Sequence, residues 1–483
     1  MEWSGKGQTE FFKYVDDHKS DYIQHLRKWV EIKSISCQRN TRPEVIRMME
    51  VAKEEFTELG GKMWLEENPL GMQTFPDGET ALLPPILLGT YPETFDTAKK
   101  TILIYGHLDV QPAQTSDGWD TEPFELIEKD GKMFGRGSTD DKGPILGWLL
   151  ALKAFKELKI ELNVNLKFCF EGMEESGGEG LSEVIFEKCP EFFNTGIDGT
   201  CVSDNYWLGT TKPCLTYGLR GIGYWHLNVE CANRDLHSGV FGGTCHEAMT
   251  DLVNLFSSLV NNKGEILIPG ITDDVAPLTP EEEATYNAID FDTEEYKEIN
   301  SLHLLKDDKK ATLMGRWRYP SLSIHGIEGA FSEPGEKTVI PRRVIGKFSI
   351  RLVPDMEPKQ IHALVQKHID EQVEKLNTPN KIWLRNAFGD SCGMAAWYGN
   401  PTGFLFEAGK VATKMVYNQE PDMTREGCSI PVCLEFEKAT KKEIILLPMG
   451  AADDGAHSQN EKLNVSNYIG GIKLLGTFLQ EIK

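Results

Sequence analysis

Acidic residues and histidines follow apolar runs, or lie in glycine-marked turns, at five separate places in the chain. One of them is EGMEESGGEG, residues 171–180, in which two adjacent glutamates come shortly after the apolar run 162–170. A carboxylate beside a buried strand is unfavourable unless a cation or a hydrogen-bond donor compensates its charge. Such a cation would take its ligands from all five places, and the candidate ligands are His107, Asp140, Glu175, Asp204 and His457.

The donor types indicate which cation would bind. Two imidazoles and three carboxylates suit a divalent ion such as Zn²⁺, Mn²⁺ or Co²⁺. Five protein ligands exceed what one catalytic Zn²⁺ with an open position takes, so they favour two ions that share a bridging carboxylate. In an extended segment, residues i and i+2 face the same side, so Asp109 is expected to accept the second ring N–H of His107 and orient the ring.

The adjacent pair Glu174 and Glu175 suggests two roles, because neighbouring side chains do not point in one direction. One glutamate is then a ligand, and the other is a general base that takes a proton from water. We expect Glu174 to be the base and Glu175 the ligand, although the sequence alone also allows the reverse. Each place is also compatible with a structural role, such as a hydrogen-bonded histidine or a solvated turn, so the metal hypothesis depends on their converging in space.

The elements that would bring them together alternate between strands and helices. After a helical stretch to about residue 59, the apolar runs 101–105 and 162–170 predict strands, and the patterns of 144–158 and 180–188 predict helices. This order is typical of an α/β domain with a mostly parallel sheet and helices on both faces. Sites in such sheets form at the carboxyl ends of the strands, where all five places are expected to lie.

The pattern changes near residue 218. Two strand-plus-helix pairs follow, at 223–260 and 338–376, and an acidic, irregular segment over about 262–320 separates them. They predict a small α+β domain inserted into the first domain, with the acidic segment as its elaboration. The expected boundaries are 1–217 and 385–483 for the first domain and 218–384 for the inserted domain.

Composition narrows the partners and the compartment. The formal net charge of −23 disfavours nucleic acid and anionic membranes, because both need clustered Lys and Arg. No run of about 18 apolar residues predicts a membrane span, and the N-terminus lacks the pattern of a secretory signal. The ten cysteines are scattered without a C-x-x-C pair, which indicates thiols rather than a disulfide framework. We therefore expect a cytoplasmic protein.

Taken together, the motifs resemble the M20 metallopeptidases and, within them, the cytosolic non-specific dipeptidases, which include the Cys-Gly dipeptidases of glutathione turnover and the carnosinases. The motifs are GHLDVQP, GRGSTDDKGP, EGMEESG, SDNYWLG, RDLHSGVFGG, SIRLVP, REGCSIP and ADDGAHSQNEK. The likeness runs from about residue 10 to the C-terminus. It implies a hydrolase with a catalytic α/β domain, an inserted α+β lid that dimerises, and two divalent ions, Zn²⁺ or Mn²⁺, in each subunit.

The resemblance also implies roles for single residues. Asp140 would bridge the two ions, and the peptide bond that follows it is expected to be cis. Glu174 would be the general base. The remaining metal ligands would be His107, Glu175, Asp204 and His457.

Residues in and near the inserted domain match positions that contact substrate in similar enzymes. His237, in DLHSGV, would reach the active site of the partner subunit and stabilise the developing oxyanion. Thr338, Arg351 and Ser429 would hold the terminal carboxylate of the substrate. A guanidinium suits this role because it is always charged and binds carboxylates in a bidentate manner. A surface or interface salt bridge is the alternative for Arg351.

These features predict a homodimer that hydrolyses unblocked dipeptides, Cys-Gly among them, with Glu174 passing a proton from water to the leaving amine. An aminoacylase-type amide deacylase is the alternative enzyme, and it would need no free amino group on its substrate. A catalytically inactive, dimeric metal-binding relative is the non-enzyme alternative, and the presence of Glu174 argues against it. Cys428 stands where relatives more often carry glycine, and 384–404 lacks a histidine found in some relatives, so side-chain preference stays open.

Overall fold

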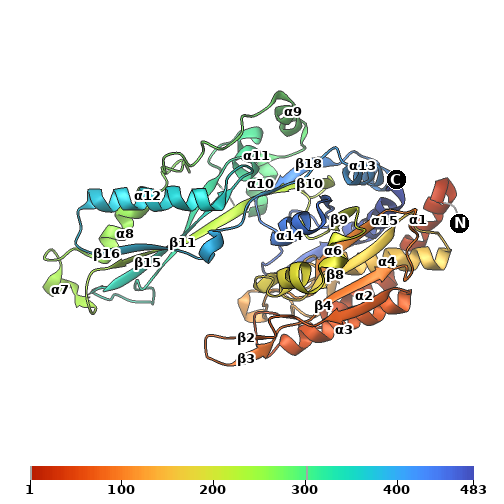
Figure 1. Ribbon diagram of the computed structural model, residues 1–483, viewed down its shortest axis with the longest axis horizontal. Coiled ribbons are helices and arrows are strands. Elements are labelled where there is room, and N and C mark those ends of the chain that lie inside the picture. The colour runs from red at the N-terminus through yellow and green to blue at the C-terminus, as the bar shows by residue number, and fades with distance from the viewer. Residues whose placement is uncertain (1–2, 301–302) are drawn as a thin grey trace. The chain divides into compact units, whose positions relative to one another are not determined.

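The computed structural model describes residues 3–300 and 303–483, and its contacts divide the chain into two compact units (Figure 1). Unit 1 comprises Met1–Tyr217, Gly399–Thr424 and Val432–Lys483, and unit 2 comprises Gly218–Tyr398 and Arg425–Pro431. The end of unit 2 differs from the predicted boundary at 384. That boundary falls inside strand β16 (Lys381–Asn386), which pairs with β11 (Gly221–Glu230) of unit 2 along its whole length.

The large sheet of unit 1 is parallel at its centre and antiparallel on both sides. The central parallel strands, in spatial order, are β8 (Asn165–Glu171), β5 (Thr101–His107), β9 (Gly199–Val202) and β19 (Glu443–Leu446). The antiparallel strands are β4 (Ile86–Tyr91) beside β8, β1 (Lys62–Glu66) at the edge beside β4, and β10 (Cys214–Leu219) beside β19. The α/β fold class is confirmed, and the sheet as a whole is mixed.

Helices cover both faces of this sheet. Successive residues of a strand point to opposite faces, so a strand that is apolar throughout needs both faces covered. In β5, the ring of Tyr105 packs against Phe436, with centroids 5.4 Å apart, whereas the adjacent Gly106 faces Ile145, which would lie 2.6 Å from an added Cβ. The main helices of unit 1 are α1 (Gln8–Asp17), α2 (Lys19–Val30), α3 (Arg42–Leu59), α4 (Lys142–Leu158), α13 (Phe404–Tyr417), α14 (Pro431–Thr440) and α15 (Val465–Glu481). The predicted helix at 180–188 is instead a short α5 (Leu181–Glu183) followed by a π-helical turn.

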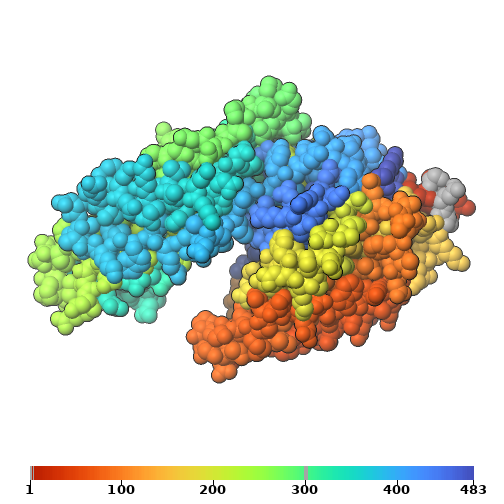
Figure 2. All heavy atoms as spheres, viewed as in Figure 1, coloured from red at the N-terminus to blue at the C-terminus, as the bar shows by residue number. Residues whose placement is uncertain are grey.

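A hairpin of β2 (Met72–Thr74) and β3 (Thr80–Leu82) projects from unit 1 and forms the orange lobe at the lower left of that unit in Figure 2. Its base is held by Arg42, a buried side chain that donates hydrogen bonds to the carbonyl of Leu82 and to the side chain of Gln73. Among the described helices of the chain, none combines the length and the apolar character that a membrane crossing needs.

Unit 2 contains a four-stranded antiparallel sheet in the order β13 (Ser321–Glu328), β15 (Arg343–Leu352), β11 and β16. Helices α8 (Ala248–Ser257) and α12 (Pro358–Leu376) contribute to its apolar core. The acidic segment contributes α9 (Pro280–Ala288), α10 (Thr293–Asn300) and α11 (Lys309–Trp317) to the same unit. Ion pairs of Glu282 with Arg318 and Arg425 help this acidic segment to pack within the unit.

Candidate metal centre

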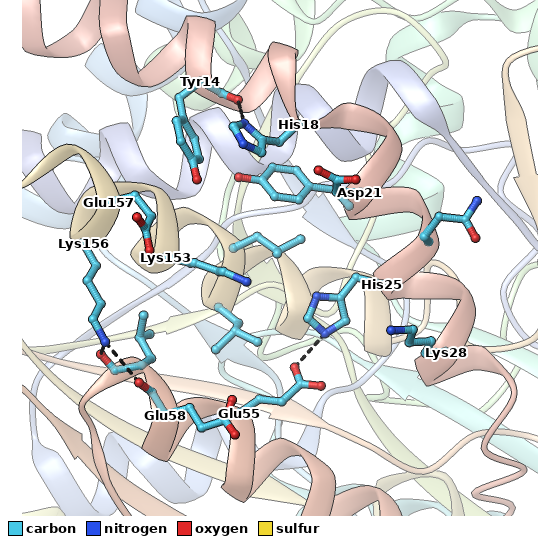
Figure 3. A pocket seen from close by; sticks show the side chains of 15 residues that line it. Tyr14, His18, Asp21, His25, Lys28, Glu55, Glu58, Lys153, Lys156 and Glu157 are labelled. Atoms are coloured by element: carbon cyan, nitrogen blue, oxygen red, sulfur yellow. Dashed lines mark hydrogen bonds and ion pairs between the residues drawn. The ribbon is translucent and has the colours of Figure 1, made fainter.

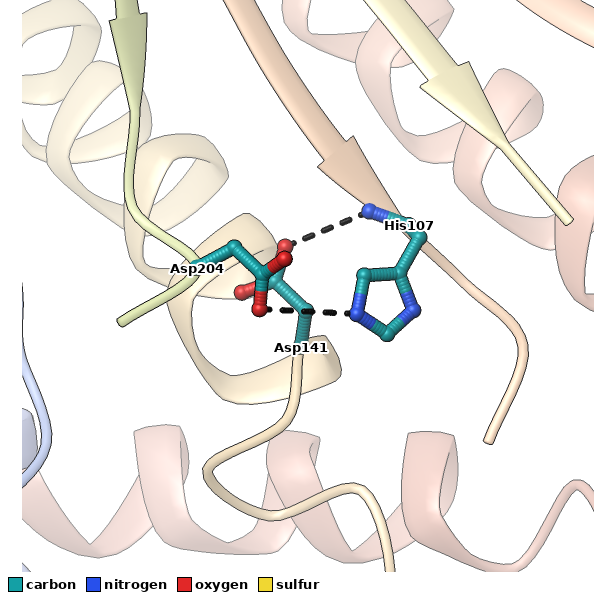
Figure 4. Close-up of side chains that lie close together, drawn as sticks. All are labelled: His107, Asp141 and Asp204. Carbon is teal, nitrogen blue, oxygen red and sulfur yellow. Dashed lines mark hydrogen bonds and ion pairs between the residues drawn. The ribbon is translucent and has the colours of Figure 1, made fainter. Parts of the chain in front are cut away.

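Two groups of ligand-type side chains lie at the carboxyl ends of the central parallel strands. In each group the candidate ligand atoms lie within 4.8 Å of one another. His107 is the last residue of β5, Glu175 follows β8, and Asp204 follows β9. The first group is His107, Asp141 and Asp204 (Figure 4), and the second is Asp140, Glu175 and His457. All five ligands expected from the sequence are therefore brought together, and Asp141 joins them.

Asp140 contacts both groups through its two carboxylate oxygens. Its Oδ1 lies 2.9 Å from Nε2 of His107, and its Oδ2 lies 3.2 Å from Nε2 of His457. The same His457 nitrogen is 3.0 Å from Oε2 of Glu175, and the His107 nitrogen is 3.6 Å from Oδ1 of Asp204. A carboxylate with one oxygen turned to each group has the arrangement that bridging between two cations requires.

The contact between His107 and Asp109 differs from the expectation. The nearest acceptor to Nδ1 of His107 is the backbone carbonyl of Asp109, at 3.1 Å, whereas the side-chain Oδ1 is 3.5 Å away. The other carboxylate oxygen of Asp109 accepts the backbone N–H of Glu175 at 3.1 Å. The ring of His107 is thus oriented mainly by a main-chain oxygen, and the buried Asp109 carboxylate connects the segments that follow β5 and β8.

Asp141 is a member of the cluster that the sequence did not assign. Its Oδ2 accepts the backbone N–H of His107 at 3.2 Å (Figure 4), and its Oδ1 is buried without a hydrogen-bond partner in the described structure. The peptide bond between Asp140 and Asp141 is cis, as expected. Consecutive residues usually point apart, so the DD pair was visible in the sequence but the convergence of both side chains on one site was not.

Burial and mutual repulsion of the carboxylates dominate the electrostatics of the cluster. Burial, together with the charges of its acidic neighbours, raises the pKa of Asp204 to about 6 and that of Glu174 well above its usual value. Burial lowers the pKa of His107, but the charge of Asp204 and hydrogen bonds to its acidic neighbours outweigh it and raise this pKa well above the usual value. These shifts report excess negative charge in a dry site, which divalent cations would compensate.

The residues expected to contact substrate form two pairs in unit 2. Strand β12 (Leu236–His237) pairs with β14 (Val339–Ile340), and the carbonyl of Thr338 accepts the backbone N–H that follows His237, at 3.2 Å. Both His237 and Thr338 are exposed. In the second pair, the guanidinium of Arg351 donates to Oγ of Ser429 at 3.0 Å.

A cavity of about 630 Å³ also lies among the first helices of unit 1 (Figure 3). Its polar groups largely satisfy one another: Nε2 of His25 lies 2.7 Å from Oε2 of Glu55, and Lys156 donates to the carbonyls of Glu58 and Leu59. None of the residues that line it belongs to the two ligand groups. The cavity is therefore separate from the candidate metal centre.

Comparison with known proteins also points to a metal-dependent peptidase. Residues 103–481 match the sequence model of peptidase family M20/M25/M40. The chain is 50% identical over 475 residues to a Cys-Gly metallodipeptidase of Schizosaccharomyces pombe, with 98% of each chain covered. It is 46% identical over 474 residues to the human Beta-Ala-His dipeptidase, covering 98% of this chain and 92% of that one. The solved structure of the di-peptidase Dug1p from Saccharomyces cerevisiae has a TM-score of 0.88 at 47% identity and covers 98% of each chain.

Proposed function

The chain belongs to peptidase family M20/M25/M40 and is a metal-dependent dipeptidase, and we propose that its substrates are free dipeptides, Cys-Gly among them, cleaved with two divalent ions in each subunit. The observation that carries this proposal is the position of Asp140, with one carboxylate oxygen turned to each of two ligand groups. Zn²⁺ and Mn²⁺ are the ions that suit these donors.

The residues present fit such ions. The buried Oδ1 of Asp141, a member of the first ligand group, has no hydrogen-bond partner in the described structure, and buried acceptors normally have one. The two groups together offer imidazole nitrogens and carboxylate oxygens and no thiol. His107, Asp204 and Asp140 would hold one ion, and Asp140, Glu175 and His457 the other, with Asp141 supporting the first through the main chain of His107.

In the proposed reaction Glu174 is the general base, because it directly precedes the ligand Glu175 in the chain. Divalent ions held by these residues would lower the pKa of a bound water molecule and polarise the scissile carbonyl. Glu174, which precedes the ligand Glu175 in a short 3₁₀ turn, takes the proton of that water and delivers it to the leaving amine. Asp109 keeps this turn in place by accepting the backbone N–H of Glu175.

Recognition of the substrate carboxylate is assigned to Arg351, with Ser429 and Thr338. The guanidinium of Arg351 makes one hydrogen bond in the described structure, to Ser429, so donors remain for a carboxylate. The neighbouring Arg220 is a poorer candidate, because it already donates to the carbonyls of Gly427 and Tyr319 and to a serine hydroxyl. A free carboxylate on the substrate is therefore part of the proposal.

We infer that the enzyme is a homodimer in which His237 acts at the site of the partner subunit. The backbone N–H of Gly239 donates to Nδ1 of His237 at 3.0 Å. In the neutral ring this leaves the proton on Nε2, which makes that nitrogen a donor for a developing oxyanion. The exposed position of His237 leaves this donor accessible to another chain.

We also propose a cytoplasmic location and a small-molecule substrate without nucleic acid or membrane partners. The described structure forms no disulfide bond although the chain has ten cysteines. Thiols persist in a reducing compartment.

A substrate panel tests the proposed reaction. We expect unblocked dipeptides to be hydrolysed much faster than tripeptides, dipeptide amides and N-acetyl amino acids, in parallel assays with Zn²⁺ and with Mn²⁺. The reason is that the carboxylate contact and the free amino group fix both ends of a short substrate. Faster turnover of N-acetyl amino acids than of dipeptides would favour the aminoacylase alternative. Absence of turnover on every substrate, in protein that binds metal, would favour the inactive relative.

Metal occupancy tests the dinuclear centre. We expect the wild-type chain to bind two equivalents of metal, and Glu175→Ala and His457→Ala each to weaken one of them, because each removes a ligand of the same group. Elemental analysis after dialysis against buffered Zn²⁺ measures this. His25→Ala is the matched control, since it removes a histidine paired with a carboxylate outside the centre. A single equivalent in the wild type at saturating metal would contradict the two-ion proposal.

A further inference from the structure

The fully buried carboxylate of Glu461 connects two segments that carry candidate ligands. One segment is the turn 136–140, which ends in Asp140. The other is 457–462, which begins with His457. No step of the proposed reaction uses Glu461, and burying a carboxylate is costly unless hydrogen bonds and an opposite charge compensate it.

Glu461 has this compensation, and it comes from the turn that presents Asp140. Its Oε1 accepts the backbone N–H groups of Gly137, Thr139 and Asp140, at 3.1, 3.1 and 3.2 Å. Its Oε2 lies 2.6 Å from a guanidinium nitrogen of Arg136, and its backbone carbonyl accepts the N–H of residue 135 at 2.9 Å. One carboxylate oxygen thus accepts three main-chain N–H groups of the turn.

Other contacts tie the same two segments together. Arg136 donates through its second terminal nitrogen to the carbonyl of Ser458 at 3.2 Å. The hydroxyl of Thr139 donates to Oδ2 of Asp454 at 2.8 Å, and Asp454 also pairs with Lys462. Glu461 lies at the centre of this network, which joins the turn that ends in Asp140 to the segment that begins with His457.

The turn itself is shaped to bring its N–H groups together. Gly137 has φ +85°, a region that favours glycine, and an added Cβ would lie 2.8 Å from Val110. Without an anion, the three N–H groups that converge near Glu461 would be buried donors lacking an acceptor. A carboxylate satisfies them and also neutralises Arg136.

We propose that Glu461 is a positioning residue that sets the distance between the two ligand groups by holding the Asp140 turn and the His457 segment in one register. This inference rests on the proposed metal centre. Glu461 touches neither a metal nor substrate in this arrangement; it acts through the main chain of Asp140. Groups that orient metal ligands in this way typically change metal affinity by about 10–100-fold when they are replaced.

Glu461→Gln removes the negative charge of the side chain and keeps its size and shape. The amide oxygen can accept from the turn only if the amide NH₂ faces Arg136, where two donors oppose each other. We expect the variant to bind at least one of its metal ions about 10–100-fold more weakly than the wild type. Titration of the metal-free full-length protein with Zn²⁺ or Mn²⁺ in competition with a chelating dye measures each dissociation constant, and thermal unfolding is followed in parallel.

Asp422→Asn is the control, because it removes the charge of a buried carboxylate elsewhere in unit 1, whose ion pair with the partly exposed Lys212 has its charged atoms 2.6 Å apart. A purely structural role for Glu461 predicts that both variants lower Tm and that neither changes metal affinity. Wild-type dissociation constants in folded Glu461→Gln, or a loss no larger than that of Asp422→Asn, would overturn the proposal.

Arg136→Lys provides the second variant if Glu461→Gln does not fold. It keeps a positive charge beside Glu461 but loses the simultaneous contact with Ser458, so we expect about a 10-fold weaker metal affinity. Unchanged affinity in this variant would also overturn the proposal. The wild-type titration is interpreted first. Binding of a single metal equivalent by the wild type would count against the two-ion centre. The ratio of the metal dissociation constants of variant and wild type would still decide the role of Glu461.

Discussion

Glu174→Gln is expected to lower kcat by at least about 10²-fold while the protein keeps its metal. Glutamine preserves the size and shape of the side chain and removes only the group that takes and returns the proton. The ligand groups do not include Glu174, so metal affinity should stay close to that of the wild type. Elemental analysis and steady-state kinetics on the same sample measure both quantities.

The control for this variant is Glu183→Gln, which makes the same chemical change on α5, outside both ligand groups. Its kcat should equal that of the wild type. Near-normal turnover in a metal-loaded Glu174→Gln sample would exclude Glu174 as the base. Loss of metal together with activity would instead make Glu174 a ligand, the reverse assignment that the sequence alone allows.

Mixed dimers of His237→Ala and Glu174→Gln chains are expected to recover about a quarter of wild-type activity per site, although each variant alone is inactive. If His237 serves the partner subunit, one centre of each heterodimer has Glu174 from one chain and His237 from the other. Random mixing makes half of the dimers mixed, with one competent centre in each, as a two-fold symmetric pairing requires. Activity is measured after subunit exchange, with each variant re-exchanged with itself as the control.

Recovery is informative only when exchange has occurred, so tagged chains are used to follow the mixed species. If heterodimers form and no activity returns, His237 acts within its own chain. Both metal equivalents should remain in His237→Ala, because His237 is in neither ligand group. A variant that lost metal as well would point to a role in folding instead.

The local pattern of the sequence predicted most of the elements that position the site. The run 101–105 became part of β5, and the helix predicted at 144–158 became α4 with one more residue pair at its start. The hydrophobic periodicity of a segment indicates which of its side chains face a core, and it can be read from residues only a few positions apart. The rule that sites form at the carboxyl ends of parallel strands then predicts that His107, Glu175 and Asp204 lie close together.

The sheet order was not available from periodicity. A buried strand reads the same whether its neighbour is parallel or antiparallel, so the antiparallel strands β4 and β10 beside the parallel centre were not foreseen. The boundary of unit 2 was misplaced for a similar reason. Residues 385–386 belong to β16 because they pair with β11, a partner far away in the chain.

The sequence by itself determined the residue types of the centre and the α/β class, because donor chemistry and hydrophobic periodicity are local properties of the sequence. Only the tertiary structure decided the hydrogen bonds that support the centre. The oxygen nearest to His107 Nδ1 is the Asp109 carbonyl rather than its carboxylate, Asp141 joins the ligands, and Glu461 binds the turn before Asp140. The contacts of Asp141 and Glu461 join segments that are distant in sequence, and the choice between the two kinds of Asp109 oxygen depends on the local backbone conformation. Residue spacing alone specifies neither.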